Sequence, residues 1–379
     1  MPETFDHLRP YTDDEVPAAI QRIVDNPAFA KITSYLFPNH STEDFRKVCL
    51  SAHTIDEFQD LVMWPVMQSI LQHTTDGVTS ENFDTVDDTH KGIFVCNHRD
   101  ILLDAALADY FLYVNKKDTL EITFGSNLMK SEMVIDIGKI NRMFRINRGG
   151  NMRDFYKNSV EVSTYMRHII CDTNRSIWIA QRNGRTKDGN DKTEMALLKM
   201  FSLSSQKDFV ENLEEIHLMP IAISYEIEPC AFLKTQEMYI TKYQRYEKTP
   251  DEDLHSILTG ITQKKGRIHI ACGSPITHEE LEFCNHFEKN KKYQQLAEII
   301  DQRIYKNYRL WPNNYIAFDL LNETHKYEQQ YTVEQQAAFM NNMEEGLKNL
   351  IGDADELREI YLGIYANPVV NTTHQAVND

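Results

Sequence analysis

The chain has 379 residues, of which 41% are hydrophobic and 26% charged, a composition typical of a globular protein with a substantial core and not of a disordered or fibrous chain. Its formal net charge of −17 argues against long-range attraction to nucleic acid or to an anionic lipid surface, so an anionic ligand must be bound by a local basic cluster. The six cysteines include no closely spaced pair, which argues against a metal site and favours reduced thiols in the cytoplasm.

The first residues, "MPETFDHLRPYTDDEV", are acidic and polar, whereas a secretory signal would be basic and then apolar. No segment approaches the roughly 18 consecutive apolar residues that a membrane-spanning helix requires. We therefore expect a cytoplasmic protein, and leave open whether it also makes peripheral contact with the inner face of the membrane.

A helical region is predicted at the N-terminus, over residues 1–89. The stretches "DEVPAAIQRIVDNPAF" and "TIDEFQDLVMWPVMQSILQH" repeat apolar residues at spacings of three and four, and Pro65 predicts a kink in the second. The apolar side chains around Trp64 could line an acyl-chain tunnel or touch lipid, but most apolar helices in globular proteins pack into the core. The polar, turn-rich residues 74–92 predict a linker.

Residues 90–280 are predicted to form an α/β domain with a mixed sheet flanked by helices. Short β-prone runs, "IFVCN", "LEITFG", "MFRIN", "SIWIA", "MPIAISY", "EMYI" and "RIHIAC", alternate with longer runs of helical spacing. Residues 281–379 then return to a helical pattern and predict a C-terminal helical extension. In this extension, Thr332 with Gln335 forms a capping box and Gly352 predicts a helix end. The last residues, "NPVVNTTHQAVND", look irregular.

His98 follows the apolar run "IFVCN" and precedes a helical pattern, which places it at the carboxyl end of a strand, where open α/β sheets bind ligands. A histidine there can act as a general base if a carboxylate orients it and stabilises the imidazolium, and Asp100 and Asp104 are the candidates. A structural interpretation also fits: Asp100 as the N-cap of a helix starting at Ile101, Asp104 in its first turn, and His98 bonded to a carbonyl.

Two basic segments provide candidate anion sites. In "GKINRMFRINRGGNMRDF" the basic residues fall within fifteen positions; they are Lys139, Arg142, Arg145, Arg148 and Arg153. Arg148 follows the strand-like "FRIN", so its guanidinium would lie at the same sheet edge as His98 and could bind a phosphate through two parallel hydrogen bonds. A solvated basic surface is the alternative for this cluster.

The second basic segment is "QRNGRTKDGNDK", after the run "SIWIA". Its basic residues, Arg182, Arg185 and Lys187, stand beside Gly184 and Gly189, so backbone amides and guanidinium groups could converge on a charged ligand. Taken alone, the segment also fits a turn-rich surface loop.

The order of these segments resembles that of the glycerolipid acyltransferases, the family that acylates glycerol 3-phosphate and lysophosphatidate. The family's first block is a histidine, four residues and an aspartate, and "NHRDILLD" resembles it, with a His98–Arg99 pair like that of the glycerol-phosphate enzymes. The second block ends in an arginine after an apolar strand, and "MFRINR" is similar, which makes Arg148 the match.

The family's third block has a glutamate and a glycine followed by an arginine, and "IAQRNGRTKDG" resembles it through Gly184 and Arg185, with Asn183 in the place of the glutamate. The fourth block is a proline in an apolar strand, matched by Pro220 in "HLMPIAISYE". "CGSPI" resembles the close of the family's domain. The resemblance covers about half of the chain, from residue 90 to about residue 280.

One further departure concerns the aspartate. Asp104 lies six positions after His98, where the family has five, so either the turn before the helix holds one extra residue or Asp100 takes the role. We favour Asp104, because "DAALADYFL" continues as the family's helix does.

The resemblance implies an O-acyltransferase of phospholipid synthesis. His98, oriented by Asp104, would take a proton from the hydroxyl of glycerol 3-phosphate or lysophosphatidate as that oxygen attacks the thioester of acyl carrier protein or coenzyme A. No bound cofactor or metal is implied. The residues expected around the substrate fall into two groups: Arg148, Arg185, Arg182, Gly184 and Asn183 at the phosphate, and Arg99 and Pro220 in the acceptor pocket.

Two other functions remain open. A binding protein that kept the scaffold would hold an anionic lipid or phosphorylated ligand without acyl transfer, and Asn183 and the offset aspartate favour it. A nucleotide-binding enzyme is disfavoured, because the sequence has no glycine-rich phosphate loop after a strand and no dinucleotide fingerprint.

Overall fold

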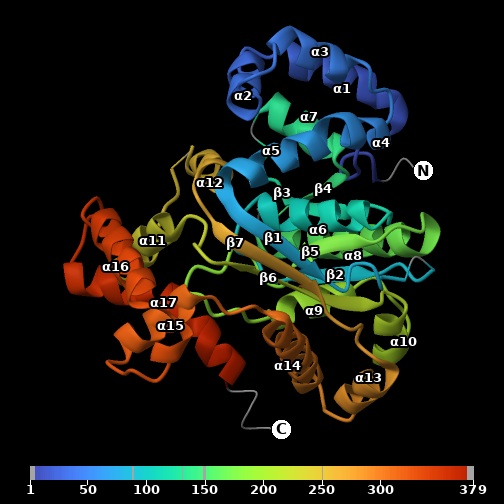
Figure 1. Ribbon diagram of the computed structural model, residues 1–379. Helices are drawn as coiled ribbons and strands as arrows, with labels where there is room; N and C mark the ends of the chain where they lie inside the picture. The colour runs from blue at the N-terminus through green and yellow to red at the C-terminus, as the bar shows by residue number, and fades with distance from the viewer. Residues whose placement is uncertain (1–4, 88, 130, 148–150, 250, 374–379) are drawn as a thin grey trace.

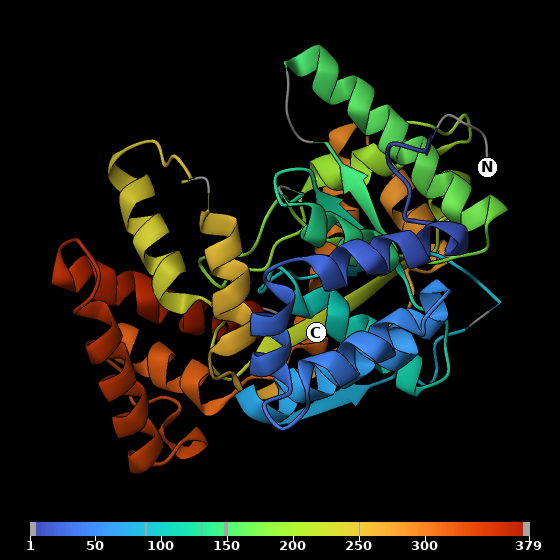
Figure 2. The ribbon, with the colours of Figure 1, turned by 90° about the horizontal axis from the view of Figure 1, so that it is seen from above.

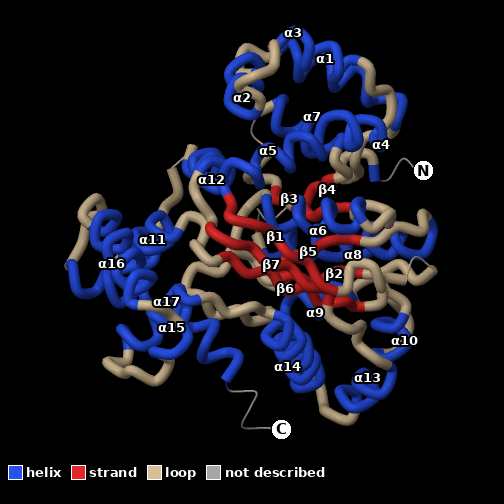
Figure 3. The backbone as a smooth tube through the Cα atoms, viewed as in Figure 1, coloured by secondary structure: helices blue, strands red, loops and turns tan. Residues whose placement is uncertain are grey.

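A mixed seven-stranded sheet lies at the centre of the molecule and confirms the predicted α/β class (Figures 1 and 3). The structure is a computed structural model that describes residues 5–87, 89–129, 131–147, 151–249 and 251–373. The strands are β1 (Thr75–Glu81), β2 (Ile93–Cys96), β3 (Glu121–Gly125), β4 (Met143–Ile146), β5 (Ile177–Ala180), β6 (Leu218–Tyr225) and β7 (Gly266–Cys272). Their order is β1-β7-β6-β2-β5-β3-β4, and neighbours are parallel except β6 and β7. The carboxyl ends of β6, β2, β5, β3 and β4 therefore share one edge.

Helices cover both faces of the sheet, which is why the central strands are continuously apolar. In β2, Ile93 and Val95 enter one core, and Phe94 and Cys96 enter the other. The first core is closed by α8 (Met152–Asp172), α9 (Met195–Phe201), α10 (Phe209–Glu214), α13 (His278–Asn285) and α14 (Asn290–Asn307). The second is closed by α5 (Trp64–Thr74) and α6 (Leu103–Val114), with α12 (Glu252–Thr262) beside α5.

The sheet begins earlier than the sequence predicts. Thr75 to Glu81, inside the expected linker of residues 74–92, form β1, which pairs in parallel with β7. This edge strand, "TDGVTSE", has neither a continuous apolar run nor a clean alternation, and its side chains are exposed or half-buried, so periodicity did not reveal it. The predicted boundary near residue 90 therefore falls after the first strand.

The N-terminal helices form a separate layer together with one helix from the α/β domain (Figures 1 and 2). They are α1 (Val16–Asp25), α2 (Phe29–Leu36), α3 (Thr42–Leu50) and α4 (Ile55–Phe58), preceded by a short 3-10 helix (Asp13–Glu15). Their apolar faces share a core with α7 (Glu132–Ile140), which lies between β3 and β4 in the sequence. The sequence pattern does not predict α7.

The helix predicted around Pro65 is interrupted where expected. A π-helical turn, Gln59–Met63, joins α4 to α5, and Pro65 lies in the first turn of α5. Proline has no N–H to donate to the preceding turn, and a π-helical turn accommodates such a missing bond. Trp64 is 5% and Met67 2% exposed, so this segment packs into the core and does not line a tunnel.

The C-terminal helices pack on one another and on α11 (Ala231–Tyr243), at the left of Figure 1. They are α15 (Pro312–Leu321), α16 (Val333–Leu347) and α17 (Ala354–Thr373), with a short 3-10 helix (Glu328–Gln330). The run "EMYI", predicted as a strand, lies within α11, because helical packing of the whole segment overrides the β propensity of a few residues. Residues 367–373, expected to be irregular, continue α17. None of the described helices combines the length and the apolar character needed to cross a membrane.

Candidate active site

His98 lies immediately beyond the carboxyl end of β2, as predicted from the run "IFVCN". The residue before it, Asn97, extends the sheet with its side chain: its Nδ2 donates to the carbonyl of Ile223 at 3.0 Å, and its Oδ1 accepts from the amide of Ile223 at 2.7 Å. This pair of hydrogen bonds to β6 fixes the backbone at the point where the chain leaves the strand. His98 therefore stands on a rigid support.

Asp104 orients the imidazole. Its Oδ2 lies 2.9 Å from His98 Nδ1 and also accepts from the backbone amides of Arg99 at 2.6 Å and Asp100 at 2.9 Å. Its Oδ1 accepts from the hydroxyl of Tyr225 at 2.7 Å, and the carboxylate is fully buried. Because the carboxylate is an acceptor, His98 Nδ1 carries the hydrogen and Nε2 keeps a lone pair for a substrate.

Asp100 has the structural role that the sequence left open. Its Oδ1 accepts from the amides of Leu102 and Leu103, both at 2.9 Å, and so caps the turn that leads into α6. The helix begins at Leu103 and not at Ile101, so the longer turn accommodates the extra residue between His98 and Asp104. Burial, and then the charge of Asp104, raise the pKa of Asp100, and its Oδ2 has no hydrogen-bond partner among the described residues.

A cavity of about 110 Å³ opens beside His98. One wall is apolar and comes from β3, β5 and the start of α6; it includes Ile122, Phe124 and Trp178, whose ring lies 5.6 Å from the imidazole in an edge-on arrangement. Charged groups also line the cavity; these are Arg185, Lys187, Lys248 and Asp253. The imidazole thus borders a cavity that is lined by both apolar and mainly basic side chains.

The loop after β5 supplies part of the basic lining. Its Thr186 amide donates to the carbonyl of His98 at 2.7 Å, which holds the loop directly against the histidine. Gly184 and Arg185 line the cavity; Arg185 Nη2 donates to Ser256 Oγ at 3.2 Å, while Nη1 is buried without a partner in the described part of the chain. Gly189 has a φ of +79°, and a side chain there would overlap the carbonyl of Ile364, so only glycine fits.

Other residues expected at the phosphate lie elsewhere. Arg182 and Asn183 do not line the cavity: Arg182 Nη1 points to the carbonyl of Asn190 at 3.5 Å, and Asn183 is exposed. Arg148 lies outside the described residues.

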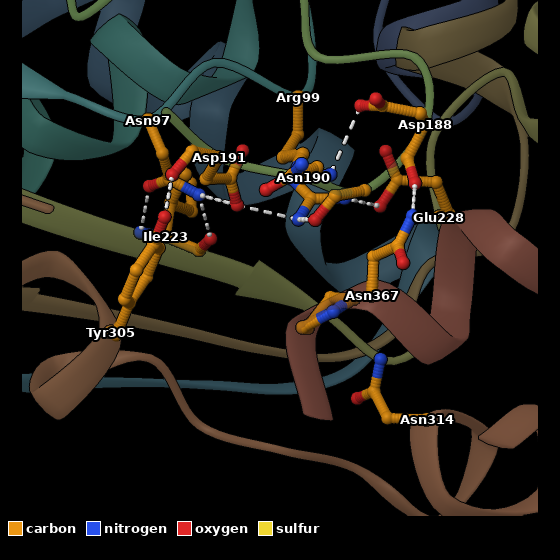
Figure 4. A network of polar contacts seen from close by, with 12 residues as sticks. Asn97, Arg99, Asp188, Asn190, Asp191, Ile223, Glu228, Tyr305, Asn314 and Asn367 are labelled. Atoms are coloured by element: carbon orange, nitrogen blue, oxygen red, sulfur yellow. Dashed lines mark hydrogen bonds and ion pairs between the residues drawn. The ribbon is translucent and has the colours of Figure 1, made fainter. Parts of the chain in front are cut away.

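Two residues expected in the acceptor pocket are placed differently. Pro220 lies in β6 opposite Val95 and is not among the residues that line the cavity. Arg99 is fully buried and does not reach the cavity lining. Its Nη2 contacts Asp191 at 2.6 Å and the carbonyl of Gly189 at 3.2 Å, and its Nη1 contacts Glu228 at 3.2 Å (Figure 4). Arg99 is thus a structural residue that joins the basic loop to the segment after β6.

Further groups at the site were not singled out from the sequence. Tyr225 at the end of β6 and Lys248 after α11 reach the site from segments more than 100 positions beyond His98. Tyr225 could have been suspected from its place at the end of a predicted strand, but nothing in the sequence marks Lys248. Within the described ranges, no three His, Cys, Asp or Glu side chains are grouped closely enough to hold a metal ion.

Comparisons with known proteins add a distant structural likeness. No protein-family model and no curated protein sequence matches the chain. Among solved structures, the chain is similar to the crystal structure of the 1-acyl-sn-glycerophosphate (LPA) acyltransferase PlsC from Thermotoga maritima, with a TM-score of 0.36 and 11% sequence identity over 76% of this chain and 94% of that chain. A likeness of this size does not establish a shared activity, so a function has to be argued from the site.

Proposed function

We propose that this protein is an O-acyltransferase that moves a fatty acyl group from a thioester to the hydroxyl of a phosphorylated glycerol or lysolipid acceptor, as the resemblance of its segments implies. The observation that carries the proposal is the His98–Asp104 pair, 2.9 Å apart, at a cavity lined by apolar side chains and by Arg185. An apolar wall suits an acyl chain, and a guanidinium with a bare N–H suits a phosphate.

The geometry supports a single-displacement mechanism. His98 Nε2 takes the proton from the acceptor hydroxyl while the oxygen attacks the thioester carbonyl carbon, and the buried Asp104 carboxylate stabilises the imidazolium that forms. The tetrahedral intermediate then collapses with cleavage of the C–S bond. The leaving thiolate takes the proton from Nε2, which restores the neutral imidazole and releases the free thiol. No covalent acyl-enzyme is required.

Arg185 orients the acceptor in this scheme. Binding of a non-reacting phosphate places the hydroxyl next to His98, so that binding energy lowers the entropic part of the barrier. The amide of Gly184 would assist, and we propose that Arg148 joins from the segment after β4. We also propose that the protein works in the cytoplasm and meets lysolipid acceptors at the inner membrane face.

The test is a thiol-release assay with purified protein, acyl coenzyme A or acyl carrier protein thioester, and a panel of acceptors that includes glycerol 3-phosphate and lysophosphatidate. We expect His98→Ala to lower kcat by about 10²–10⁴-fold, because a positioned general base contributes this much, while the melting temperature stays close to that of the wild type. His286→Ala, at an exposed histidine bonded only to a backbone carbonyl, is the control and should leave the rate unchanged.

Unchanged release by His98→Ala would contradict the proposal. If no acceptor supports release by the wild type while lysophosphatidate still binds to it, the protein is instead a binding protein that shares the scaffold.

A further inference from the structure

A second, larger groove adjoins the cavity at His98. Its volume is about 640 Å³, and it is lined by the end of α11, by residues 244–246, and by Lys187 and Lys248. Lys187 and Lys248 line both the groove and the His98 cavity, so the two spaces meet at these side chains. A ligand too long for a cavity of about 110 Å³ can therefore continue into the groove.

The groove is basic, whereas the chain as a whole is strongly acidic. It contains one carboxylate, Glu237, and four basic side chains; these are Lys187, Lys242, Arg245 and Lys248. Lys242 pairs with Glu356 at 2.7 Å and Lys248 with Asp253 at 2.6 Å, with side chains 54% and 43% exposed. Lys242 is exposed, so its pair with Glu356 contributes little and its ammonium group remains available to a multiply charged anion. Lys248 is held by a buried carboxylate, and Lys187 is paired with Glu237 within the groove.

Arg245 has no carboxylate partner among the residues that the structure describes, and it is exposed at the centre of the lining segment. A guanidinium is suited to bind phosphate through two parallel hydrogen bonds.

Tyrosines accompany these basic groups. Tyr243 is 60% exposed, its ring lies 5.3 Å from that of Tyr239 at an interplanar angle of 56°, and Tyr246 also lines the groove. An exposed tyrosine ring beside arginine and lysine provides stacking for a ring and charge for phosphates. This combination does not suit an acyl chain, which the apolar wall at His98 suits better.

We infer that this groove binds the phosphate end of a phosphopantetheine thioester donor, so that the pantetheine arm passes between Lys187 and Lys248 and delivers the thioester to His98. The inference rests on the proposed acyl transfer. Coenzyme A and acyl carrier protein both carry a phosphate next to pantetheine, which is the chemistry that Lys242 and Arg245 recognise. Coenzyme A alone adds an adenine ring, for which Tyr243 provides the stacking surface.

The experiment compares donors with and without phosphate. One acyl group is supplied as the coenzyme A thioester, as the acyl carrier protein thioester, and as the N-acetylcysteamine thioester, which has no phosphate. We expect the double variant Lys242→Glu with Arg245→Glu to raise KM for at least one phosphate-bearing donor by about tenfold or more, with kcat and the KM for the N-acetylcysteamine thioester unchanged. Lys207→Glu, a charge reversal at another exposed lysine paired with a glutamate, should change none of these values.

The arms also identify the natural donor. A rise in KM limited to the carrier-protein thioester assigns the groove to that protein's prosthetic group. A rise for coenzyme A that Tyr243→Ala reproduces, with no effect of Tyr243→Ala on the carrier-protein thioester, assigns the groove to coenzyme A. Either result supports the inference, whereas equal KM values in wild type and double variant for both phosphate-bearing donors, or an equal rise for all three, would overturn it.

Failure of the proposed acyl transfer is distinguishable from failure of this inference. If the wild type releases thiol from no donor, the acyl transfer fails, and titration calorimetry with coenzyme A and with holo acyl carrier protein then tests the groove alone. Binding to the wild type that the double variant loses supports the groove, and the absence of binding to either overturns it. Should the double variant not fold, Arg245→Gln, which changes one exposed side chain, replaces it in both measurements.

Discussion

His98 and Arg99 are neighbours in the sequence, but their side chains are placed in opposite environments. His98 faces a cavity, with one ring nitrogen bonded to Asp104 and the other left for a substrate. Arg99 is fully buried between Asp191 and Glu228. Burial lowers the pKa of Arg99, but Asp191, with Tyr308 and Glu228, outweighs it, so the pKa is raised well above its ordinary value and the charge is permanent. One residue is placed to exchange a proton and the next to hold a fixed charge.

The charge of Arg99 organises the scaffold around the histidine. Asp191 and Gly189 belong to the loop that carries Arg185, and Glu228 is also bonded by Lys234 of α11 at 2.5 Å. Helices α14 and α17 reach the same region (Figure 4): Tyr305 Oη of α14 donates to the carbonyl of Asp191 at 2.5 Å, and Asn367 of α17 donates to that of Asp188 at 2.7 Å. These two helices therefore hold the loop that lines the proposed phosphate site.

Among the variants that test this comparison, Arg99→Met should have the largest effect on stability. The change removes the guanidinium and leaves Asp191 buried without its cationic partner, with a hydrogen bond from the neutral amide of Asn97, so we expect the free energy of unfolding to fall by about 3–5 kcal/mol. Urea denaturation measures the loss. His98→Ala is the matched variant: it should abolish acyl transfer with little change in stability, whereas Arg99→Met should destabilise first. A stability loss for Arg99→Met no greater than that of Lys207→Met, at an exposed pair, would contradict the structural role.

The placement of His98 could be predicted from the sequence, whereas that of Arg99 could not. His98 could be placed because a continuous apolar run identifies a buried strand and the ligand edge follows from the strand direction. Arg99 could not, because its two carboxylates lie 92 and 129 positions further along the chain, and a histidine–arginine pair alone suggested a substrate contact. Sequence spacing contains no information on which long-range partner neutralises a charge.

Local sequence patterns also fail to reveal β1, and they do not show which arginine of the basic loop lines the cavity. An exposed edge strand has no period to read, and Arg185 and Arg182 look alike in "QRNGRT" although only Arg185 lines the cavity. Which of two arginines three positions apart faces a site depends on the path of the loop. That path is fixed here by the hydrogen bond from Thr186 to His98 and by the close contact of Gly189 with α17.

Tyr225→Phe tests the support of the His98–Asp104 pair and should have a smaller effect. Burial, and then the charge of Asp104, raise the pKa of Tyr225 well above its ordinary value, so the hydroxyl remains a donor to Asp104 Oδ1. Loss of a hydrogen bond to a charged acceptor costs about 1.5–3 kcal/mol. We expect Tyr225→Phe to lower the free energy of unfolding, measured by urea denaturation, by this amount and to lower kcat as well. Tyr361→Phe is the control, since its hydroxyl contacts only neutral groups and lies among the C-terminal helices; it should leave kcat unchanged. Equal kcat for Tyr225→Phe and wild type would show that Asp104 needs no support from β6.

The smallest expected effects are those of two glycine-to-alanine changes in helices. They should differ in the sign of their effect on stability. At Gly260 in α12, a Cβ would overlap Asp100 Oδ2 and lie 3.0 Å from its Cγ, and Asp100 cannot yield freely because its other oxygen caps the turn before α6. At Gly363 in α17, nothing lies within 4 Å of an added Cβ.

Alanine is the better helix former by about 1 kcal/mol, so Gly363→Ala should stabilise the protein by about that amount. In Gly260→Ala, overpacking that costs about 1–3 kcal/mol offsets this gain, and because displacement of Asp100 distorts the turn that follows His98, kcat should fall as well. If both variants were stabilised equally with unchanged kcat, the turn between His98 and Asp104 would have to be more adaptable than its hydrogen bonds indicate.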